Sequence, residues 1–382
     1  MTPSPAGSIL AVNAGSSSLK LRVLDGGDGI TAALDLDPWD GSAEHQELSA
    51  FLGTLTGITA AGHRVVHGGR TFTGPALIDA VVTGLIADLV SLAPLHQPRA
   101  LAGIAAARDA FPDLPHVACF DTAFHAGLPE EAATYPLPAA WRERFGLRRF
   151  GFHGLSHAYA ARRAADLAGR TADAGRLRVV TCHLGAGASL AAVHGGRSVD
   201  TTMGFTPCEG LVMATRCGSV DPGMLVWLLD EGRLPLADLA RAIEHASGLA
   251  GLAALPSGSG DMRQVRSAAA GGHPGARLAL AVHAHRLAAA IAAMAAAMNG
   301  LDILVFTGGI GEHDPRTRAE AVSRLGFLQV AIDPGRNEAA RGDADISAPG
   351  AAVTTLVVTA REDAEIARQV RDLVQSGRSM LR

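Results

Sequence analysis

Three glycine-rich turns in this chain could bind phosphate oxygens. They span 13–20 (NAGSSSLK), 184–189 (LGAGAS) and 307–312 (TGGIGE). Glycine lets backbone N–H groups approach an anion closely, and serine hydroxyls add short neutral donors. Each turn alone would also suit an ordinary hairpin, but three of them in one chain point to a polyphosphate ligand.

The turns do not match the two best-known nucleotide signatures. The first lacks the pattern GxxxxGK[ST], because Lys20 follows the serines on an expected strand. Gly185 and Gly187 have no third glycine at dinucleotide-binding spacing, and they lead into a strand instead of a helix. The sequence therefore argues against a Walker-type site and against NAD binding.

Charged residues lie beside apolar strands. Arg64 precedes Val-Val-His-Gly-Gly, Asp121 ends His-Val-Ala-Cys-Phe-Asp, and Arg216 lies in Met-Ala-Thr-Arg-Cys-Gly. Loops at strand ends are where α/β folds build sites, although a lone arginine is often a salt-bridge partner and a lone aspartate a cap. Two arginines, an aspartate and phosphate-binding turns together fit phosphoryl transfer, which depends on positioning and charge neutralisation.

Two histidines, His153 and His157, have the spacing of metal ligands on a helix. Gly154 separates them, His153 is expected to precede the helix, and the HExxH motif is absent. We therefore favour His153 as a hydrogen-bond donor to developing charge. His283 and His285 are expected to be ordinary parts of a long helix.

Alternating strands and helices place these residues in an α/β fold. Apolar runs predict strands, and longer periodic segments predict helices. The expected strands are 8–12, 19–24, 64–66, 116–120, 178–183, 190–193, 302–306 and 354–359, and the expected helices are 98–110, 156–168, 274–298 and 363–373, with one more opening at Asp314-Pro315. The strand-turn-strand plan of 8–24 recurs at 178–193, which is a weak sign of two related halves.

The composition limits the class of protein. The chain has 382 residues, 48% hydrophobic and 18% charged, with a net charge of −4. It is expected to fold, with length enough for two domains, and its charge gives no general attraction to nucleic acid or anionic lipid. The longest apolar run, 278–298, is interrupted by His283, His285 and Arg286. A cytoplasmic protein with no membrane span is therefore expected.

Cysteine and lysine are both scarce. Cys119, Cys182, Cys208 and Cys217 include no CxxC pair, so buried thiols are expected rather than a metal or redox site. Of 33 basic residues only Lys20 is a lysine, and it falls beside the first glycine-serine turn. A compact ammonium there could follow a moving phosphoryl group better than a planar guanidinium.

The motifs, taken together, resemble those of acetate kinases along essentially the whole chain. They occur in the family's order at 12–20, 63–69, 92–96, 120–125, 151–157, 203–207, 215–218 and 306–312. The resemblance implies the acetate and sugar kinase/Hsp70/actin fold, with two related lobes and an interdomain active-site cleft. It also implies Mg²⁺-dependent, direct in-line phosphoryl transfer between ATP and acetate, giving ADP and acetyl phosphate, with Mn²⁺ as an alternative metal.

The resemblance also implies roles for individual residues. The catalytic residues would be Arg64, Asp121, His153 and Arg216, and the metal site would use Asn13 and Glu362. Arg64 would also bind substrate, beside an apolar pocket for the acetate methyl formed by Val66, Leu95, Phe152 and Pro207. The nucleotide and its phosphates would contact Ser16, Ser18, Lys20, His183, Gly185, Gly187, Asp261, Met262, Arg263, Gly309, Ile310 and His313. Since acetate is already ionised at neutral pH, Asp121 would position and stabilise charge rather than act as a base.

Several positions depart from the family's usual motifs. Ala186 replaces an asparagine, Ser219 an aspartate, His313 an asparagine and Gln97 an asparagine. These departures leave open a nucleotide-binding regulatory protein of weak activity. A propionate- or butyrate-preferring kinase is a second alternative, since one methylene changes binding by only ~1–3 kcal/mol. The phosphoryl donor could be ATP, GTP or pyrophosphate.

The resemblance implies a homodimer of two-lobed subunits. The expected lobes are 1–127 with 364–382, and 128–363, with a hinge near 127–138. Acetate and ATP would be the partners, with no nucleic acid or membrane.

Overall fold

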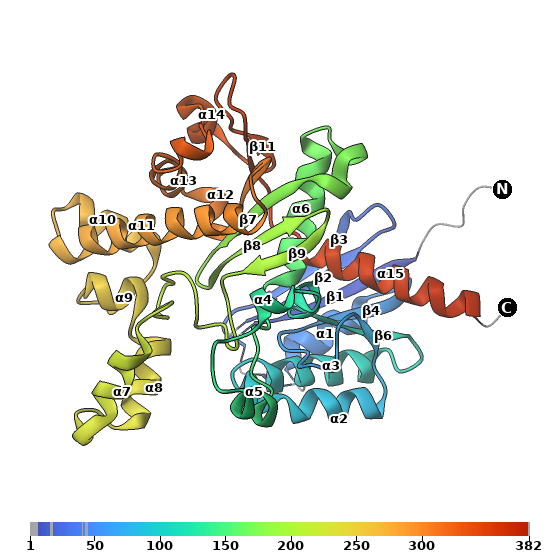
Figure 1. Ribbon diagram of the computed structural model, residues 1–382. Coiled ribbons are helices and arrows are strands. Elements are labelled where there is room, and N and C mark those ends of the chain that lie inside the picture. Colours follow the sequence, from blue (N-terminus) through green and yellow to red (C-terminus); the bar gives the residue numbers. More distant parts are fainter. Residues whose placement is uncertain (1–6, 16–17, 40, 43–44, 381–382) are drawn as a thin grey trace. The chain divides into compact units, whose positions relative to one another are not determined.

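The chain folds into two compact units, each built on one six-stranded sheet (Figure 1). The computed structural model describes residues 7–15, 18–39, 41–42 and 45–380. The first unit comprises Met1–Ala126, Phe152–Tyr159 and Arg361–Arg382, and the second comprises Gly127–Gly151 and Ala160–Ala360. The lobe boundaries expected from the sequence remain a prediction.

The first sheet has the strand order β3-β2-β1-β4-β6-β5. Its strands are β1 (Ser8–Ala14), β2 (Leu19–Leu24), β3 (Ile30–Leu36), β4 (Ile58–Val65), β5 (Ala76–Leu77) and β6 (His116–Phe120). Strands β1, β2 and β3 form an antiparallel meander, as the expected hairpin requires. Strands β1, β4 and β6 are parallel, so their carboxyl ends lie at the same edge of the sheet.

The second sheet repeats this topology, in the order β11-β12-β10-β7-β8-β9. Its strands are β7 (Arg178–Leu184), β8 (Ala188–His194), β9 (Arg197–Thr201), β10 (Ile303–Thr307), β11 (Ala344–Asp345) and β12 (Thr354–Val357). Here β7, β8 and β9 form the antiparallel meander, and β7, β10 and β12 are parallel. The weak sequence repeat therefore marks two units of the same topology, and the expected α/β class is confirmed.

Helices cover both faces of the first sheet. They are α1 (Gln46–Thr54), α2 (Ala80–Asp88), α3 (Gln97–Ala110), α15 (Glu362–Met380) and the start of α6 (Gly154–Leu167). Helices α1 and α3 pack on the face that carries Leu10 and Val12. Helix α15 packs on the opposite face, against Ile9 and Ala11. Glu362 begins α15, so the helix brings its first carboxylate to this unit from the far end of the chain.

The second unit carries most of the helices. They are α4 (Glu130–Ala133), α5 (Ala139–Phe145), α7 (Pro222–Leu229), α8 (Leu236–His245), α9 (Gly248–Ala253), α10 (Met262–Ala270), α11 (Pro274–Ala297), α12 (Gly308–His313), α13 (Pro315–Val322) and α14 (Pro334–Ala339). Helix α11 starts at a proline, and the ring of His273 caps it by accepting from Ala276 N at 3.2 Å. It packs against α9 and α10.

Helix α11 is long and apolar enough to cross a membrane by length and composition alone. A core helix meets the same criterion, and 44% of its most apolar window is buried. His283 and His285 both lie in it, as expected, and burial lowers the pKa of His283 to about 4. The contacts of α11 with α9 and α10 favour a role as a core helix.

Several helices and strands were not expected from the sequence, among them β3, β9 and α7 to α10, and α15 extends beyond the expected 363–373. Two further differences concern the candidate site. Strand β4 begins at Ile58 rather than at Arg64. The expected glycine turn at 307–312 is the short helix α12, which follows β10 directly. Gly308 makes this possible with φ +77°, and a Cβ there would lie within 2.8 Å of the Leu184 carbonyl oxygen.

Candidate active site

Polar side chains gather at the carboxyl ends of the parallel strands in the first unit. Asn13 lies near the end of β1, Arg64 near the end of β4, and Asp121 directly after β6. Along β4 and β6, Gly62 and Cys119 lie on the face that α15 covers. Because strand side chains alternate between faces, Arg64 and Asp121, two residues further on, lie on this same face.

Hydrogen bonds join these side chains into a chain of four. The Arg64 guanidinium donates from Nε to Asp121 Oδ1 at 3.1 Å and from Nη2 to Asp121 Oδ2 at 2.6 Å. Its Nη1 donates to Asn13 Oδ1 at 3.0 Å, and Asn13 Nδ2 donates to Glu362 Oε2 at 2.6 Å. These bonds use one N–H on each guanidinium nitrogen. The second N–H of Nη1 and of Nη2 can therefore meet a substrate oxygen.

In the Arg64–Asp121 pair the carboxylate is buried, while the arginine side chain stays 14% exposed. Asp121 is 1% exposed, and burial raises the pKa of its carboxyl while the Arg64 guanidinium opposes this. Burial alone would lower the pKa of Arg64, but the carboxylates of Asp121 and Glu362 outweigh it and the pKa is raised. Arg64 thus stays cationic, and we assign Asp121 as the carboxylate that fixes its orientation.

His153 lies where the chain turns into α6. Its φ of +57° is unusual for a residue with a side chain, and its backbone N–H bonds the Asp121 carboxylate and lowers the pKa of that group. Gly154 N donates to the Asp121 carbonyl oxygen at 3.1 Å, and a Cβ on Gly154 would collide with that oxygen. His153 thus precedes the helix, as expected, whereas His157 is buried within it. Strained backbone of this kind is common at functional sites.

The expected methyl pocket is only partly assembled within the first unit. Val66 and Phe152 are buried, and the Phe152 ring meets the His67 ring edge-on with centroids 5.4 Å apart. Leu95 lies in the turn before α3 and is 44% exposed. Gln97, which replaces the usual asparagine, is buried and donates to the His67 carbonyl oxygen at 3.0 Å. It thus supports the segment that follows Val66.

The first glycine-serine turn joins β1 to β2. Gly15 N donates to the Ser18 carbonyl oxygen at 2.7 Å, which closes the turn. Ser16 lies outside the described residues. Lys20 is exposed on β2 and pairs in register with Asn13, so its side chain leaves the sheet on the same face as Asn13.

We expect Lys20→Arg to lower kcat by about ten- to hundredfold. One charge-assisted hydrogen bond contributes ~1.5–3 kcal/mol, and each ~1.36 kcal/mol is a factor of ten in rate. A hydroxamate assay of acetyl phosphate measures the effect. The matched control is Arg22→Lys, two residues along the same strand, where the arginine pairs with Asp35. If both variants keep wild-type kinetics, Lys20 has no part in the site.

In the second unit, Arg216 and Pro207 are directly linked. Arg216 Nη1 donates to the Pro207 carbonyl oxygen at 2.5 Å. Burial lowers the pKa of Arg216, although a guanidinium remains charged at any physiological pH. The bond holds Arg216 beside the backbone of the residue expected to contact the acetate methyl.

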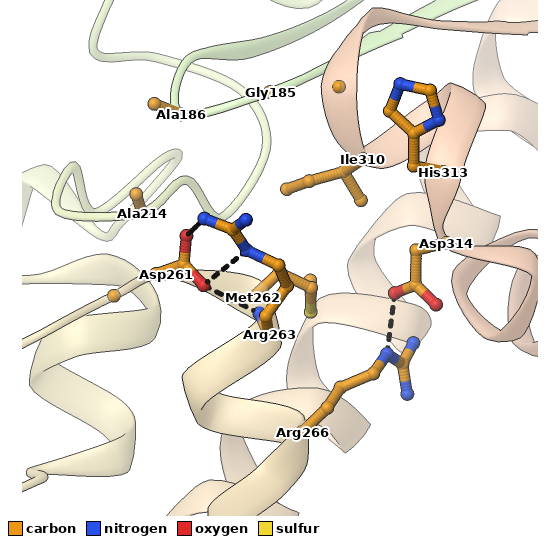
Figure 2. Close-up of a pocket in the computed structure, with 12 residues that line it drawn as sticks. Gly185, Ala186, Ala214, Asp261, Met262, Arg263, Arg266, Ile310, His313 and Asp314 are labelled. Atoms are coloured by element: carbon orange, nitrogen blue, oxygen red, sulfur yellow. Dashed lines mark hydrogen bonds and ion pairs between the residues drawn. The ribbon is translucent and has the colours of Figure 1, made fainter.

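The second unit also contains a cavity of about 440 Å³. Its lining comprises Gly185, Ala186, Ala214, Gly260, Asp261, Met262, Arg263, Arg266, Gly309, Ile310, His313 and Asp314. Figure 2 shows Ile310 and His313 reaching in from α12, opposite the start of α10. Small and apolar residues line much of it, with charged groups at its side, which suits an adenine ring and a ribose.

The ion pairs that line the cavity differ in their exposure to solvent. Asp261 caps α10 by accepting from Arg263 N at 2.9 Å, and its carboxylate pairs with the 92% exposed Arg263 side chain. Such exposed pairs hold their partners weakly. Arg266 is instead largely shielded from solvent and pairs with Asp314 at 2.6 Å (Figure 2). It also pairs with Glu320.

The structure gathers most of the residues expected at the nucleotide. The cavity takes in Gly185, Asp261, Met262, Arg263, Gly309, Ile310 and His313, whereas His183 and Gly187 are not among its lining residues. Gly187 closes the neighbouring turn, where its carbonyl oxygen accepts from Gly185 N at 2.9 Å. Sequence reasoning missed Arg266 and Asp314. Asp314 was noted only as the start of a helix, and no motif marked Arg266.

Asn13 and Glu362 fit a magnesium ion by their chemistry. Mg²⁺ takes oxygen ligands and commonly uses one or two carboxylates together with substrate phosphates. Within the part of the chain that the structure describes, no group of three or more His, Cys, Asp or Glu side chains is placed to hold a metal. A site of one carboxylate, one amide oxygen and the nucleotide's phosphates is consistent with this donor set.

Comparisons with known proteins find relatives over most of the chain. The sequence profile of the Acetokinase family matches residues 42–368. The chain is 46% identical to an acetate kinase of Deinococcus deserti, over 96% of this chain and 97% of that protein. It is 44% identical to an acetate kinase of Leifsonia xyli, over 97% and 99% of the two chains.

Solved structures give the same result over nearly the full length. The Porphyromonas gingivalis acetate kinase matches with a TM-score of 0.87 at 34% identity, covering 97% of this chain and all of that one (100%). A propionate kinase of Francisella tularensis matches with a TM-score of 0.86 at 33% identity, over 95% and 98% of the two chains. The family profile over residues 42–368, the relatives at 44–46% identity and the structural match over nearly the whole chain show that the chain belongs to the acetokinase family.

Proposed function

We propose that this chain is an acetate kinase that transfers the terminal phosphoryl group of ATP to acetate, reversibly, giving acetyl phosphate and ADP. The observation that carries the proposal is the Arg64 guanidinium. Asp121 and Asn13 fix it in one orientation, and it keeps N–H groups for a substrate oxygen. A planar fork held in this way matches the oxygens of a carboxylate or a phosphoryl group.

In the proposed reaction an acetate oxygen attacks the terminal phosphorus in line with the departing ADP oxygen. Acetate is ionised at neutral pH, so no group has to remove a proton from it. Asp121 is tied to Arg64 by two hydrogen-bonded oxygens, which suits orientation and charge balance better than proton transfer. Arg64 and Arg216 neutralise charge on the transferring group, and His153 donates to it.

The proposed nucleotide site is the cavity of the second unit. Ile310 and Met262 offer apolar surface for the base, and the Asp261 carboxylate accepts from a ribose hydroxyl. The main-chain N–H groups of Ala186, Gly187 and Gly309 would meet the phosphates, since Gly185 N and Gly308 N already donate within the chain. Ala186 offers no side-chain donor, so binding at this turn depends on backbone groups.

Mg²⁺, when bound with ATP, would neutralise phosphate oxygens. Asn13 Oδ1 and the Glu362 carboxylate are the groups of this chain that would hold it, directly or through water. The bond between them keeps the two side chains together. It turns the Asn13 N–H toward Glu362 and the amide oxygen toward Arg64, so an ion held directly by both residues would replace this bond.

The decisive experiment compares acetate, propionate and butyrate as substrates. With ATP and Mg²⁺, we expect the highest kcat/KM for acetate, with propionate lower by about ten- to two-hundredfold, because a methylene contributes ~1–3 kcal/mol. The hydroxamate assay measures each acyl phosphate. Replacing ATP by GTP or pyrophosphate in the same assay identifies the phosphoryl donor.

Two results would contradict the proposal. A kcat/KM optimum at propionate or butyrate would make the chain a kinase of that acid. Absence of acyl phosphate with every acid, while ATP still binds, would favour a regulatory nucleotide-binding protein.

We further propose that the enzyme is a cytoplasmic homodimer without nucleic-acid or membrane partners. The family resemblance and the net charge of −4 support this. Helices α7 and α8 expose the apolar side chains of Val226, Trp227 and Leu236, which a subunit interface would cover.

A further inference from the structure

Two cysteines of the second unit lie in contact. Cys208 Sγ and Cys217 Sγ are 3.7 Å apart. Cys208 Sγ also lies 3.6 Å from the Ile243 carbonyl oxygen, and Cys217 Sγ lies 3.0 Å from that of Gly218. The sequence predicted buried thiols at all four cysteines, but these two are only half-buried, whereas Cys119 and Cys182 are fully buried. Two accessible thiols in contact are the minimum requirement for a reversible disulfide.

The chemistry of the pair is asymmetric. The contact with Cys208, in which either thiol can donate, lowers the pKa of Cys217, although burial opposes this. That same contact and burial raise the pKa of Cys208. Burial raises the pKa of Cys119 and of Cys182, which suits inert core thiols. The thiolate is the nucleophile, and Cys217, unlike Cys208, lines a cavity, so its position together with its lowered pKa favours it as the attacking member of the pair.

A small oxidant has a route to Cys217. This residue lines a second cavity of about 420 Å³, together with Val220, Ser247 and Arg286 among others. The cavity lies within the second unit and has no lining residue in common with the proposed nucleotide cavity. The Arg286 guanidinium offers a cation for the carboxylates of a peptide-sized thiol compound.

We propose that Cys208 and Cys217 form a thiol–disulfide site that reacts with low-molecular-weight disulfides and lowers the turnover of the enzyme when oxidised. The Cys217 thiolate attacks one sulfur of the small disulfide and releases a first thiolate. The Cys208 thiolate then attacks Cys217 Sγ in the mixed disulfide and releases the second thiolate. The pair loses two electrons and its protons, the oxidant gains the electrons, and the released thiolates take up the protons.

The effect on turnover follows from the neighbours of the two cysteines, and it rests on the proposed function. Cys208 directly follows Pro207, and Cys217 directly follows Arg216. To form the bond, the sulfur atoms must approach by about 1.6 Å from their 3.7 Å contact. This pulls on both segments that the Arg216–Pro207 hydrogen bond aligns. Misplacing a positioning group by ~1 Å can cost about a hundredfold in rate.

The test exposes the whole enzyme to oxidised glutathione. Trypsin cuts after Arg197, Arg216 and Arg233, so the two cysteines fall in separate peptides. We expect a cross-linked pair of peptides 198–216 and 217–233 by mass spectrometry, and a fall in kcat of about ten- to hundredfold. Dithiothreitol should break the cross-link and restore kcat. Cys119 and Cys182 should still react with an alkylating agent after the oxidised protein is denatured.

The variants Cys217→Ser and Cys208→Ser are the matched controls. Each should retain the activity of the reduced enzyme and form no cross-link. Cys208→Ser should stop at the mixed disulfide on Cys217, whereas Cys217→Ser should not react with oxidised glutathione. Absence of the cross-link in the wild-type enzyme, or a wild-type mixed disulfide that never resolves, overturns the site. A complete cross-link with unchanged kcat overturns the regulatory effect. The mass measurement does not depend on turnover, so a reduced enzyme that makes no acetyl phosphate contradicts the proposed function separately.

Discussion

Replacing Arg64 by alanine is expected to lower kcat by about a thousandfold or more, the range found when a transition-state arginine is removed from a phosphoryl-transfer enzyme. Arg64 contacts both Asp121 and Asn13, and it carries the N–H groups proposed to meet the substrate. The loss should appear mainly in kcat, because the charge that Arg64 neutralises is that of the transferring group. The hydroxamate assay with acetate, ATP and Mg²⁺ measures it.

Stability has to be separated from catalysis in this test. Arg64→Ala leaves the Asp121 carboxylate buried without its partner, which costs about 3–5 kcal/mol. The double variant Arg64→Ala/Asp121→Asn removes the unpaired charge, so it should regain much of the lost Tm without regaining activity. Arg22→Ala, which breaks an exposed pair with Asp35 on the same sheet, should leave both quantities near wild type. Turnover of the folded single variant within about tenfold of wild type would refute the role of Arg64.

The sequence predicted strands well where apolar residues run together. Strand β6 has the expected bounds 116–120, and β1 and β2 form the expected hairpin. The start of β4 was missed, because Ala60, Ala61 and Gly62 have low strand propensity. Position 62 has room only for glycine because helix α15 packs against it: a Cβ there would collide with Val370. The requirement comes from a helix at the other end of the chain.

Helix α12 was missed for a related reason. Its residues include three glycines, which disfavour a helix in isolation. In the fold, Gly308 N donates to Glu312 Oε1 at 3.0 Å, and that same oxygen accepts from Ala360 N at 3.0 Å. A single carboxylate thus ties the start of this helix to the segment after β12. Such long-range bonds override local propensity, and a sequence pattern does not display them.

In the candidate site, too, the sequence predicted the individual residues but not the long-range contacts between them. Motifs identified Asn13, Arg64, Asp121 and Glu362 individually, but not the hydrogen bonds between them. Asn13 and Glu362 are 349 positions apart and lie within 2.6 Å through Nδ2 and Oε2. Sequence reasoning proposed a positioning role for Asp121, and the fold of the first unit adds the contact through which it would act, the paired hydrogen bonds to Arg64. Arg266 and Asp314 also required the fold, because their pairing brings α10 to the start of α13.

Arg216→Ala is expected to lower kcat by about a thousandfold as well, on the same argument of charge neutralisation. Arg216 differs from Arg64 in its anchor, since it donates to the Pro207 carbonyl oxygen at 2.5 Å instead of to a carboxylate. No carboxylate forms a hydrogen bond with it among the described residues, so its full charge is available to the substrate, and its loss leaves no buried anion. The Tm of Arg216→Ala should therefore change less than that of Arg64→Ala, while the activity loss is similar.

Two further variants make the Arg216 test specific. Arg233→Ala is the matched control, because Arg233 also donates to a backbone oxygen, that of Trp227 at 2.9 Å, but on the surface of the same unit. Arg216→Lys keeps the charge and loses the planar fork, so it should recover only part of the rate. Full recovery by lysine would reduce the role of Arg216 to charge alone. Near-normal turnover of Arg216→Ala would remove Arg216 from the reaction, and with it the reason for the Cys208–Cys217 disulfide to affect turnover.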